Sequence, residues 1–321
     1  MRQLVQAVRS GDLKIVEAPD PIIDSTQVLV QTTRSLVSAG TERAVRELAS
    51  ASLLQKARAR PDLVRQVIKK ARQDGVRATA GTVRARLEED MPLGYSASGV
   101  VLEVGPAVPH LRPGTRVATG GAGHGDLQVV AGLLAVPVPD AVSDADASFA
   151  TVASIALHGL RMADVGPGGS VCVVGLGLIG QLTVRLALAS GLRVYGVDLR
   201  DWTIEVARGA GAAAGVEEGD QTTHAIVDWS RGRGVDAVLL TAATPSSTPV
   251  QLAPERLRDR GTVVVVGDVG LDLERTPFYE KELSLRVARS YGPGRYDRSY
   301  EGWSVDYPVG HVPFTEGRNL E

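Results

Sequence analysis

The stretch that decides the fold is SVCVVGLGLIGQLTVRLALASGLRVYGVD, residues 170–198. It begins with an apolar run typical of a buried strand, turns through a glycine-rich loop and continues as an amphipathic helix. A second apolar run follows and ends at Asp198, eighteen residues after Gly180. A GxGxxG turn between strand and helix, with an acidic residue at this distance, predicts a βαβ unit that binds a dinucleotide.

Each residue of the glycine turn has a structural role in binding a dinucleotide. Gly175 permits the tight turn, and Gly177 lets the backbone approach a pyrophosphate. Gly180 lets the helix pack closely against the strand. Leu178 and Ile179 open the helix, where free N–H groups and the positive end of the helix dipole attract phosphate. We therefore predict that these five residues contact the cofactor.

The remaining cofactor residues follow later strands. Asp198 can accept hydrogen bonds from ribose hydroxyls and would repel a 2′-phosphate, which favours NAD(H), whereas Arg200 leaves NADP(H) open. The nicotinamide end should lie at the carboxyl ends of later strands, which indicates Thr241, Ala242 and Gly267. A dinucleotide fold that has lost its ligand is the alternative.

Outward from this unit, strands alternate with helices from residue 150 to 286, as in a doubly wound parallel sheet. Residues 249–260, PVQLAPERLRDR, predict a helix, and residues 262–270 predict a strand. Residues 1–149 instead alternate short apolar runs with turn residues, which predicts a mostly antiparallel β domain. Residues 287–321 predict a strand that leads into long loops.

Composition limits the class of protein. The chain has 321 residues, enough for two domains, and is 44% hydrophobic. Its net charge of −2 argues against a polyanionic partner such as nucleic acid. The single cysteine, Cys172, excludes a disulfide framework and a multi-thiolate zinc site. No apolar run is long enough to span a membrane or to form a secretory signal, so we expect a cytoplasmic protein.

Positive charge gathers in one segment. Residues 43–86 hold twelve Lys or Arg against three Asp or Glu, a local net of +9, and predict a basic helical insertion over residues 43–90. The insertion is interpreted either as a lid over an anionic substrate or cofactor phosphate, or as a solvated surface or oligomer contact.

Two stretches, GYSASGVVLEVGPAV (94–108) and LRPGTRVA (111–118), carry a family resemblance together with the glycine turn. The chain resembles the medium-chain dehydrogenase/reductase superfamily. This implies an α/β fold, with a Rossmann doubly wound parallel sheet (150–286) and a mostly β GroES-like catalytic domain (1–149). It also implies a return of residues 287–321 to the catalytic domain, and a homodimer.

A narrower resemblance rests on SLVSAGTER (35–43) and DYPVGHVPFTEGRN (306–319). These stretches are similar to the N-terminal half of bacterial bi-domain oxidoreductases. In that group the chain continues beyond the equivalent of Glu321, so we expect a shortened protein or a fragment. A separate oxidoreductase partner is then an option.

The resemblance also implies a zinc-independent site. Ala39 stands where zinc-dependent relatives have a cysteine ligand, and Gly94-Tyr95-Ser96 stands where they have Gly-His-Glu. Tyr95 is the predicted hydrogen-bond donor to the reacting oxygen, supported by Ser38, Ser96 and Glu42. A tyrosine ring that only packs against the core is the alternative.

Further candidate residues are less specific. His158 could act as a proton relay or be a structural histidine, and His124 could be a loop residue or an acid/base. Ser96, Tyr291 and Arg295 are predicted to contact substrate, and an arginine there suits a phosphate or carboxylate.

Three functions remain open. The first is an NAD(H)-dependent oxidoreductase that acts on an alcohol/carbonyl pair of a polar small molecule, such as a sugar, a cyclitol or a biosynthetic intermediate. The second is an enoyl- or quinone-type C=C reductase. The third is a non-catalytic dinucleotide-binding partner of a second oxidoreductase.

Overall fold

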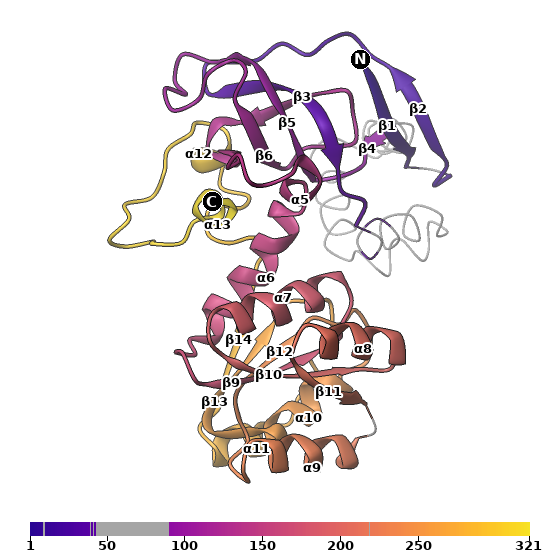
Figure 1. Ribbon diagram of the computed structural model, residues 1–321, viewed down its shortest axis with the longest axis vertical. Helices are drawn as coiled ribbons and strands as arrows, with labels where there is room; N and C mark the ends of the chain where they lie inside the picture. The colour runs from indigo at the N-terminus through magenta and orange to yellow at the C-terminus, as the bar shows by residue number, and fades with distance from the viewer. Residues whose placement is uncertain (9, 39, 41, 43–89, 218) are drawn as a thin grey trace, which may run out of the picture. The chain divides into compact units, whose positions relative to one another are not determined.

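The computed structural model describes residues 1–8, 10–38, 40, 42, 90–217 and 219–321. These residues form two compact units, Met1–Phe149 and Ala150–Glu321, which Figure 1 shows. The basic segment 43–86 and its predicted helices and lid lie outside the described residues. Among the helices of the described chain, none combines the length and apolar character that a membrane span requires.

The first unit is built from antiparallel sheets, which confirms the predicted mostly β, GroES-like domain. Val28 and Val30, on one face of the strand β3 (Gln27–Ser35), are fully buried. A three-stranded sheet has the order β2 (Leu13–Glu17), β1 (Arg2–Ala7), β4 (Asp90–Pro92), and a five-stranded sheet has the order β7 (Leu127–Ala131), β3 (Gln27–Ser35), β5 (Ser96–Val104), β6 (Arg116–Gly120), β8 (Ala135–Pro137). A 3₁₀ turn, Gly132–Leu134, and the short helix α5 (Asp144–Ala147) complete the unit.

The second unit has a parallel sheet of six strands in the order β11-β10-β9-β12-β13-β14, and this is the predicted Rossmann arrangement. The strands are β9 (Ser170–Val174), β10 (Arg193–Asp198), β11 (Ala213–Val216), β12 (Val235–Leu240), β13 (Leu257–Val265) and β14 (Ser284–Val287). The helices are α6 (Ala150–Ala163), α7 (Leu178–Ala189), α8 (Asp201–Gly209), α9 (Asp220–Trp229), α10 (Thr248–Arg256) and α11 (Arg275–Glu280).

The core of this unit lies on both faces of the sheet. Val171 and Val173 of β9 pack into one apolar cluster with Val184 of α7. Cys172 and Val174, on the opposite face of the same strand, pack into a second cluster. Strands buried on both faces are expected where helices cover a parallel sheet. Burial raises the pKa of the Cys172 thiol to about 12, as expected for a cysteine in a hydrophobic core.

The predicted helix over residues 249–260 is wrong in its last turn. The helix α10 ends at Arg256, and Leu257 is extended and pairs with Val235 in the sheet. Lys281 Nζ donates to the carbonyl oxygens of Pro254 and Leu257, at 2.8 and 2.9 Å. In a continued helix, the Pro254 carbonyl would instead accept from residue 258. A distant lysine therefore takes over the hydrogen bonds that the longer helix needed.

Residues 287–321 contain α12 (Arg298–Glu301) and α13 (Glu316–Leu320) and pack within the second unit. Ser154 Oγ of α6 donates to the carbonyl oxygen of Asn319, at 2.7 Å. The assignment of this segment to the catalytic domain stays a prediction.

Candidate active site and cofactor-binding turn

The glycine turn follows β9 and leads into α7, so it lies at the carboxyl edge of the parallel sheet. Gly175 has a φ of +94°, and a Cβ there would lie 2.6 Å from the Ala242 nitrogen. A Cβ on Gly180 would lie 1.9 Å from the carbonyl oxygen of Gly175. A Cβ on Gly177 would meet nothing within 4 Å. Packing therefore requires glycine at two positions, while the third leaves open space beside the backbone.

The start of α7 has the character of an anion site. Gly177 is the extended N-cap residue, and no side chain caps the helix. The first backbone bond into the helix runs from Gln181 N–H to the Gly177 carbonyl, at 2.8 Å. The N–H groups of Leu178 and Ile179 precede this bond, so they lie in the turn whose donors have no partner within the helix. Together with the dipole of a 12-residue helix, they suit a phosphate.

Asp198 ends β10 with a nearly buried side chain, 7% exposed. Its Oδ2 accepts from the Leu176 N–H at 2.6 Å, and its Oδ1 accepts from Arg200 N–H and Nε at 3.1 and 3.2 Å. Burial opposes ionisation, but the hydrogen bonds from Arg200 and Leu176 outweigh it and lower the pKa of the Asp198 carboxyl. The carboxylate thus ties the second strand to the glycine turn.

Thr241, Ala242 and Gly267 adjoin the same turn. Thr241 Oγ1 donates to the Gly175 carbonyl oxygen at 2.5 Å. A Cβ on Gly267 would lie 2.0 Å from the Ala242 carbonyl oxygen, so these backbones are in close contact. The open space at Gly177, the uncapped helix and the acidic residue at the end of β10 together fit a dinucleotide.

In the first unit, His124 joins residues that are far apart in the sequence. Its Nε2 lies 3.2 Å from Glu42 Oε1, and its Nδ1 lies 2.9 Å from Ser35 Oγ. The residue is 9% exposed. Its backbone is fixed by bonds from His124 N–H to the Leu93 carbonyl and from Leu4 N–H to the His124 carbonyl, at 2.7 and 2.8 Å. The sequence identified His124 only as a loop residue or an acid/base, and it missed Ser35.

One tautomer of His124 satisfies both contacts. With the proton on Nε2, the ring donates to the carboxylate of Glu42, which can only accept. Nδ1 then accepts from the hydroxyl of Ser35, an exposed residue. Ser38 N–H also donates to Glu42 Oε1, at 2.9 Å. Ser38 and Glu42, both predicted site residues, therefore lie in one hydrogen-bonded group with His124.

Tyr95 follows a turn that packs on the His124 ring. Gly94 has a φ of +94°, and a Cβ there would lie 3.0 Å from two ring carbons of His124. Tyr95 itself is half-buried, and its carbonyl oxygen accepts from Gly121 N–H at 2.9 Å. Ser96 is buried, and its hydroxyl donates to the Ser148 carbonyl at 2.6 Å. This bond gives Ser96 a structural role, and its predicted substrate contact stays a prediction.

Ala39 lies outside the described residues, so a zinc-independent site stays a prediction. Within those residues, no three His, Cys, Asp or Glu side chains come close enough together to hold a metal ion. Glu42 and His124 contact each other as a pair. At the two positions where zinc-dependent relatives have His and Glu, this chain has the phenol of Tyr95 and the buried hydroxyl of Ser96.

The remaining predicted residues gather in the second unit. Tyr291 is 2% exposed, and the guanidinium carbon of Arg295 lies 5.2 Å from its ring centroid. His158 Nδ1 would lie 3.6 Å from a Cβ on Gly292. Burial, followed by the charges of Arg161 and Arg289, lowers the pKa of His158. The imidazole is therefore neutral near pH 7, as a structural histidine or a proton acceptor requires.

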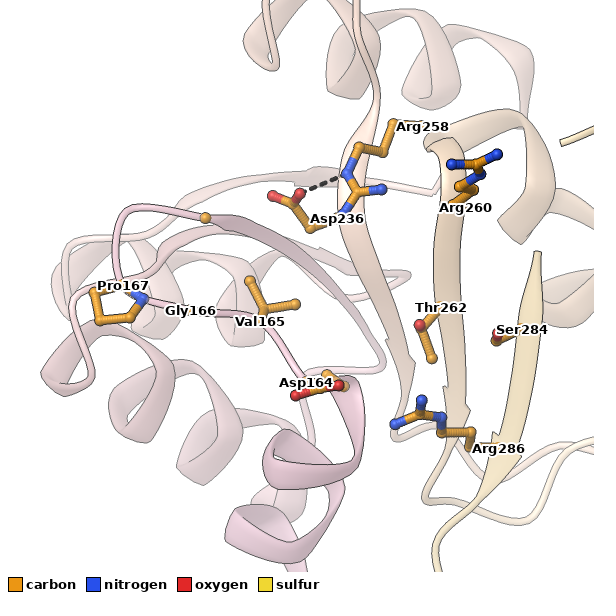
Figure 2. Close-up of a pocket in the computed structure, with 12 residues that line it drawn as sticks. Asp164, Val165, Gly166, Pro167, Asp236, Arg258, Arg260, Thr262, Ser284 and Arg286 are labelled. Carbon is orange, nitrogen blue, oxygen red and sulfur yellow. Dashed lines mark hydrogen bonds and ion pairs between the residues drawn. The ribbon is translucent and has the colours of Figure 1, made fainter. Parts of the chain in front are cut away.

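A cavity of about 450 Å³ lies at the amino ends of the strands of the second unit. Figure 2 shows the side chains that line it. Arg258 Nε donates to Asp236 Oδ1 at 2.6 Å, and Ser170 N–H donates to Asp236 Oδ2 at 2.7 Å. These bonds join the starts of three strands. The glycine turn lies at the opposite, carboxyl end of the same strands, and none of the predicted site residues lines this cavity.

Comparison with known proteins gives consistent matches. A family profile described as "Zinc-binding dehydrogenase" matches residues 179–302. A protein named as a D-xylulose reductase of Rhizobium meliloti is 30% identical over 257 residues, which cover 67% of this chain and 71% of the relative. D-xylulose reductase A of Aspergillus oryzae is 28% identical over 250 residues, which cover 65% of this chain and 69% of the relative.

A solved structure supports the fold. Galactitol-1-phosphate dehydrogenase of Escherichia coli superimposes with a TM-score of 0.70 at 19% identity, over 92% of this chain and 85% of the other. At this identity, the superposition establishes the shared fold.

Proposed function

Because this chain belongs to the medium-chain, zinc-binding-type family of alcohol dehydrogenase-like proteins, we propose that it is an NAD(H)-dependent oxidoreductase. It transfers a hydride between nicotinamide and a hydroxyl-bearing or carbonyl carbon of a polar small molecule. The observation that carries this proposal is the open space at Gly177 beside the uncapped start of α7, with Asp198 at the end of β10.

The preference for NAD(H) rests on Asp198. Its carboxylate would accept from the ribose hydroxyls and would repel a 2′-phosphate at the same place. Arg200 already donates to this carboxylate at 3.2 Å. It would have to leave Asp198 to bind a 2′-phosphate, which would expose the carboxylate to that phosphate.

The proposed chemistry uses Tyr95 as a hydrogen-bond donor to the substrate oxygen. Oxidation of an alcohol leaves growing negative charge on that oxygen until the carbonyl forms, and a fixed donor stabilises it. When bound, NAD⁺ supplies the hydride acceptor. The sequence departs from the family's zinc ligands at Ala39 and Tyr95, so the proposed reaction needs no zinc.

We propose that the proton released by alcohol oxidation is taken up by the hydrogen-bonded group of Ser35, His124 and Glu42. The Ser35 hydroxyl can pass its proton to Nδ1 of His124 while it takes up the substrate's proton. The resulting imidazolium would be stabilised by Glu42, 3.2 Å from Nε2. In the reverse direction the same groups return the proton.

The proposed substrates are polyols and the matching ketoses. The relatives are named for D-xylulose and galactitol 1-phosphate, both polyhydroxylated molecules. A hydroxyl-rich substrate also agrees with the predicted Tyr and Arg contacts of residues 291–295.

Two measurements test the proposal. Titration with NADH and NADPH should give clearly tighter binding of NADH. Turnover of NAD⁺ with a panel of polyols should then exceed turnover of NADH with enones or quinones. NADH binding without turnover of any polyol, ketose, enone or quinone would instead favour the non-catalytic alternative.

The role of Tyr95 is tested by Tyr95→Phe, which removes only the hydroxyl. We expect a fall in kcat of about 10-fold or more with unchanged NADH affinity, because a hydrogen bond made in the transition state is lost. Tyr279→Phe, at a residue that is 67% exposed in α11, is the matched control. An unchanged kcat in Tyr95→Phe would exclude Tyr95 as the donor.

A further inference from the structure

Three neighbouring side chains near the end of the chain carry buried polar atoms that have no hydrogen-bond partner within the described residues. They are Tyr291 Oη, Arg295 Nε and both carboxyl oxygens of Glu316. Tyr291 is 2% exposed and Glu316 is 0% exposed. Folded proteins rarely leave buried polar groups unpaired, so a cluster of four such atoms needs an explanation.

The three side chains are neighbours. The guanidinium carbon of Arg295 lies 5.2 Å from the Tyr291 ring centroid. Glu316 N–H donates to the carbonyl oxygen of Pro293, which stands between the other two in the sequence, at 2.8 Å. Burial and then the charge of Glu316 raise the pKa of Tyr291, which places the carboxyl within electrostatic reach of the phenol.

The backbone that presents these groups is strained and firmly held. Ser290 and Tyr296 have φ values of 51° and 66°, in the left-handed region that non-glycine residues rarely occupy. Asn319 Nδ2 donates to the Tyr291 carbonyl at 2.7 Å, and the Asn319 carbonyl accepts from Ser154 Oγ of α6. Strain of this kind persists only where the surroundings impose it, and it concentrates at functional sites.

Charge indicates what the cluster could bind. Two guanidinium groups, Arg289 and Arg295, and two carboxyl groups, Glu301 and Glu316, act on one another here. Arg295 Nη1 is already paired with Glu301 Oε1. Burial, and then the charge of Glu301, raises the pKa of Glu316 to about 8, so this carboxyl is mostly protonated near pH 7 and adds no negative charge. Arg295 and Glu301 balance each other, so the cluster has no excess positive charge to attract a carboxylate or phosphate.

Hydroxyl groups match the unpaired atoms. A hydroxyl can donate to a Glu316 oxygen and accept from Arg295 Nε or Tyr291 Oη, so two adjacent hydroxyls could satisfy the whole cluster. Arg295 is the partly open member, with 25% of its side chain exposed, whereas Tyr291 and Glu316 are buried.

We infer that Tyr291, Arg295 and Glu316 form a binding site for the adjacent hydroxyls of a neutral polyol or sugar. The inference names the substrate class of the proposed oxidoreductase and rests on that function for its catalytic meaning. It replaces the earlier expectation of a phosphate or carboxylate at Arg295 with a neutral ligand, and it adds Glu316 to the site.

Calorimetric titration of the full chain with xylitol and galactitol tests the inference, with and without saturating NADH. Xylonate, which carries a carboxylate, is the anionic probe. We expect the polyols to bind more tightly than xylonate. Tyr291→Phe should weaken polyol binding about 10-fold, the loss of one hydrogen bond, and Glu316→Gln should also weaken it. Tyr279→Phe, at the exposed residue of α11, should leave it unchanged.

The outcomes separate the two proposals. If Tyr291→Phe and Glu316→Gln left polyol binding unaltered, the proposed site would be overturned. It would also be overturned if the protein bound NADH but no polyol, and the unpaired atoms would then be satisfied by buried water. Tighter binding of xylonate would overturn the neutral ligand class. Polyol binding that depends on both residues, in a protein that does not bind NADH, would preserve the site and refute the proposed oxidoreductase.

Discussion

His124 has both ring nitrogens committed, one to Glu42 at 3.2 Å and one to Ser35 at 2.9 Å. Asparagine at this position keeps a polar side chain but cannot take up a proton. We therefore expect His124→Asn to lower kcat about 100-fold, the usual scale of a lost general acid/base, with NADH affinity unchanged. Steady-state kinetics and an NADH titration measure the two quantities.

The matched control is His110→Asn, because His110 also lies in the first unit and its Nε2 lies only near a backbone oxygen, that of Gly132, at 3.3 Å. Equal loss of activity in the two variants would show a general effect on the unit. Full activity in His124→Asn would remove the proposed proton transfer.

Glu316 makes stability depend on pH. Burial, and then the charge of Glu301, raises its pKa from 4.5 to about 8. Between these two values the folded state keeps a proton that the unfolded state has released. Stability therefore falls as pH rises through this window, and it stops falling above about pH 8. Urea unfolding at a series of pH values measures the slope.

Glutamine at this position does not titrate, so the slope contributed by Glu316 should vanish in Glu316→Gln. Glu280→Gln, at an exposed residue of α11, should retain the slope of the unmodified protein. Identical slopes in all three proteins would contradict the buried, protonated carboxyl.

At the residue scale, the sequence predicted what local spacing encodes. The distances from Gly175 to Gly180 and on to Asp198 follow from one βαβ unit, so the turn could be identified directly. The partners of His124 could not, because Ser35 and Glu42 lie 89 and 82 residues away and only the fold brings them together. Glu316 follows a phenylalanine and a threonine in a loop-like stretch, with no pattern that signals burial.

At the element scale, the turn between β9 and α7 allows a paired test. Alanine at Gly180 would place a Cβ 1.9 Å from the Gly175 carbonyl oxygen, whereas alanine at Gly177 has open space. Gly180→Ala should lower the free energy of unfolding by about 1–3 kcal/mol, as overpacking does. Gly177→Ala should leave unfolding unchanged and weaken NADH binding, because the added methyl group occupies the phosphate's approach.

Thermal unfolding and NADH titration of the two variants measure these effects. If Gly177→Ala bound NADH as the unmodified protein does, the phosphate would not lie at this turn. If Gly180→Ala unfolded at the same temperature as the unmodified protein, the backbone of Gly175 would have to move away from the added methyl group at no cost in stability. That result would contradict the tight packing at this turn.

Elements with strong apolar periodicity were predictable, and elements set by tertiary contacts were not. The helix predicted over residues 249–260 fails at Leu257, where pairing with Val235 and the bonds from Lys281 override helix propensity. The strand Ala213–Val216 was missed because AAGV has little strand propensity, and its parallel pairing with β10 defines it.

At the scale of the whole molecule, the alternation of strands and helices predicted the doubly wound sheet, and its order β11-β10-β9-β12-β13-β14 places the glycine turn beside Thr241 and Gly267. Function depends on more than this fold, since one fold supports many reactions. We propose that Tyr95, His124 and Glu316 distinguish polyol oxidation from other reactions of the fold. Sequence spacing does not reveal the neighbours of His124 and Glu316.

The most direct test of the central claim is the rate of NADH formation when the protein is mixed with NAD⁺ and xylitol, sorbitol or galactitol. We predict NADH formation with at least one polyol, at a rate clearly above that of NADPH formation from NADP⁺, because the carboxylate of Asp198 would repel a 2′-phosphate. No NADH formation with any polyol, or a faster reaction with NADP⁺, would contradict the account.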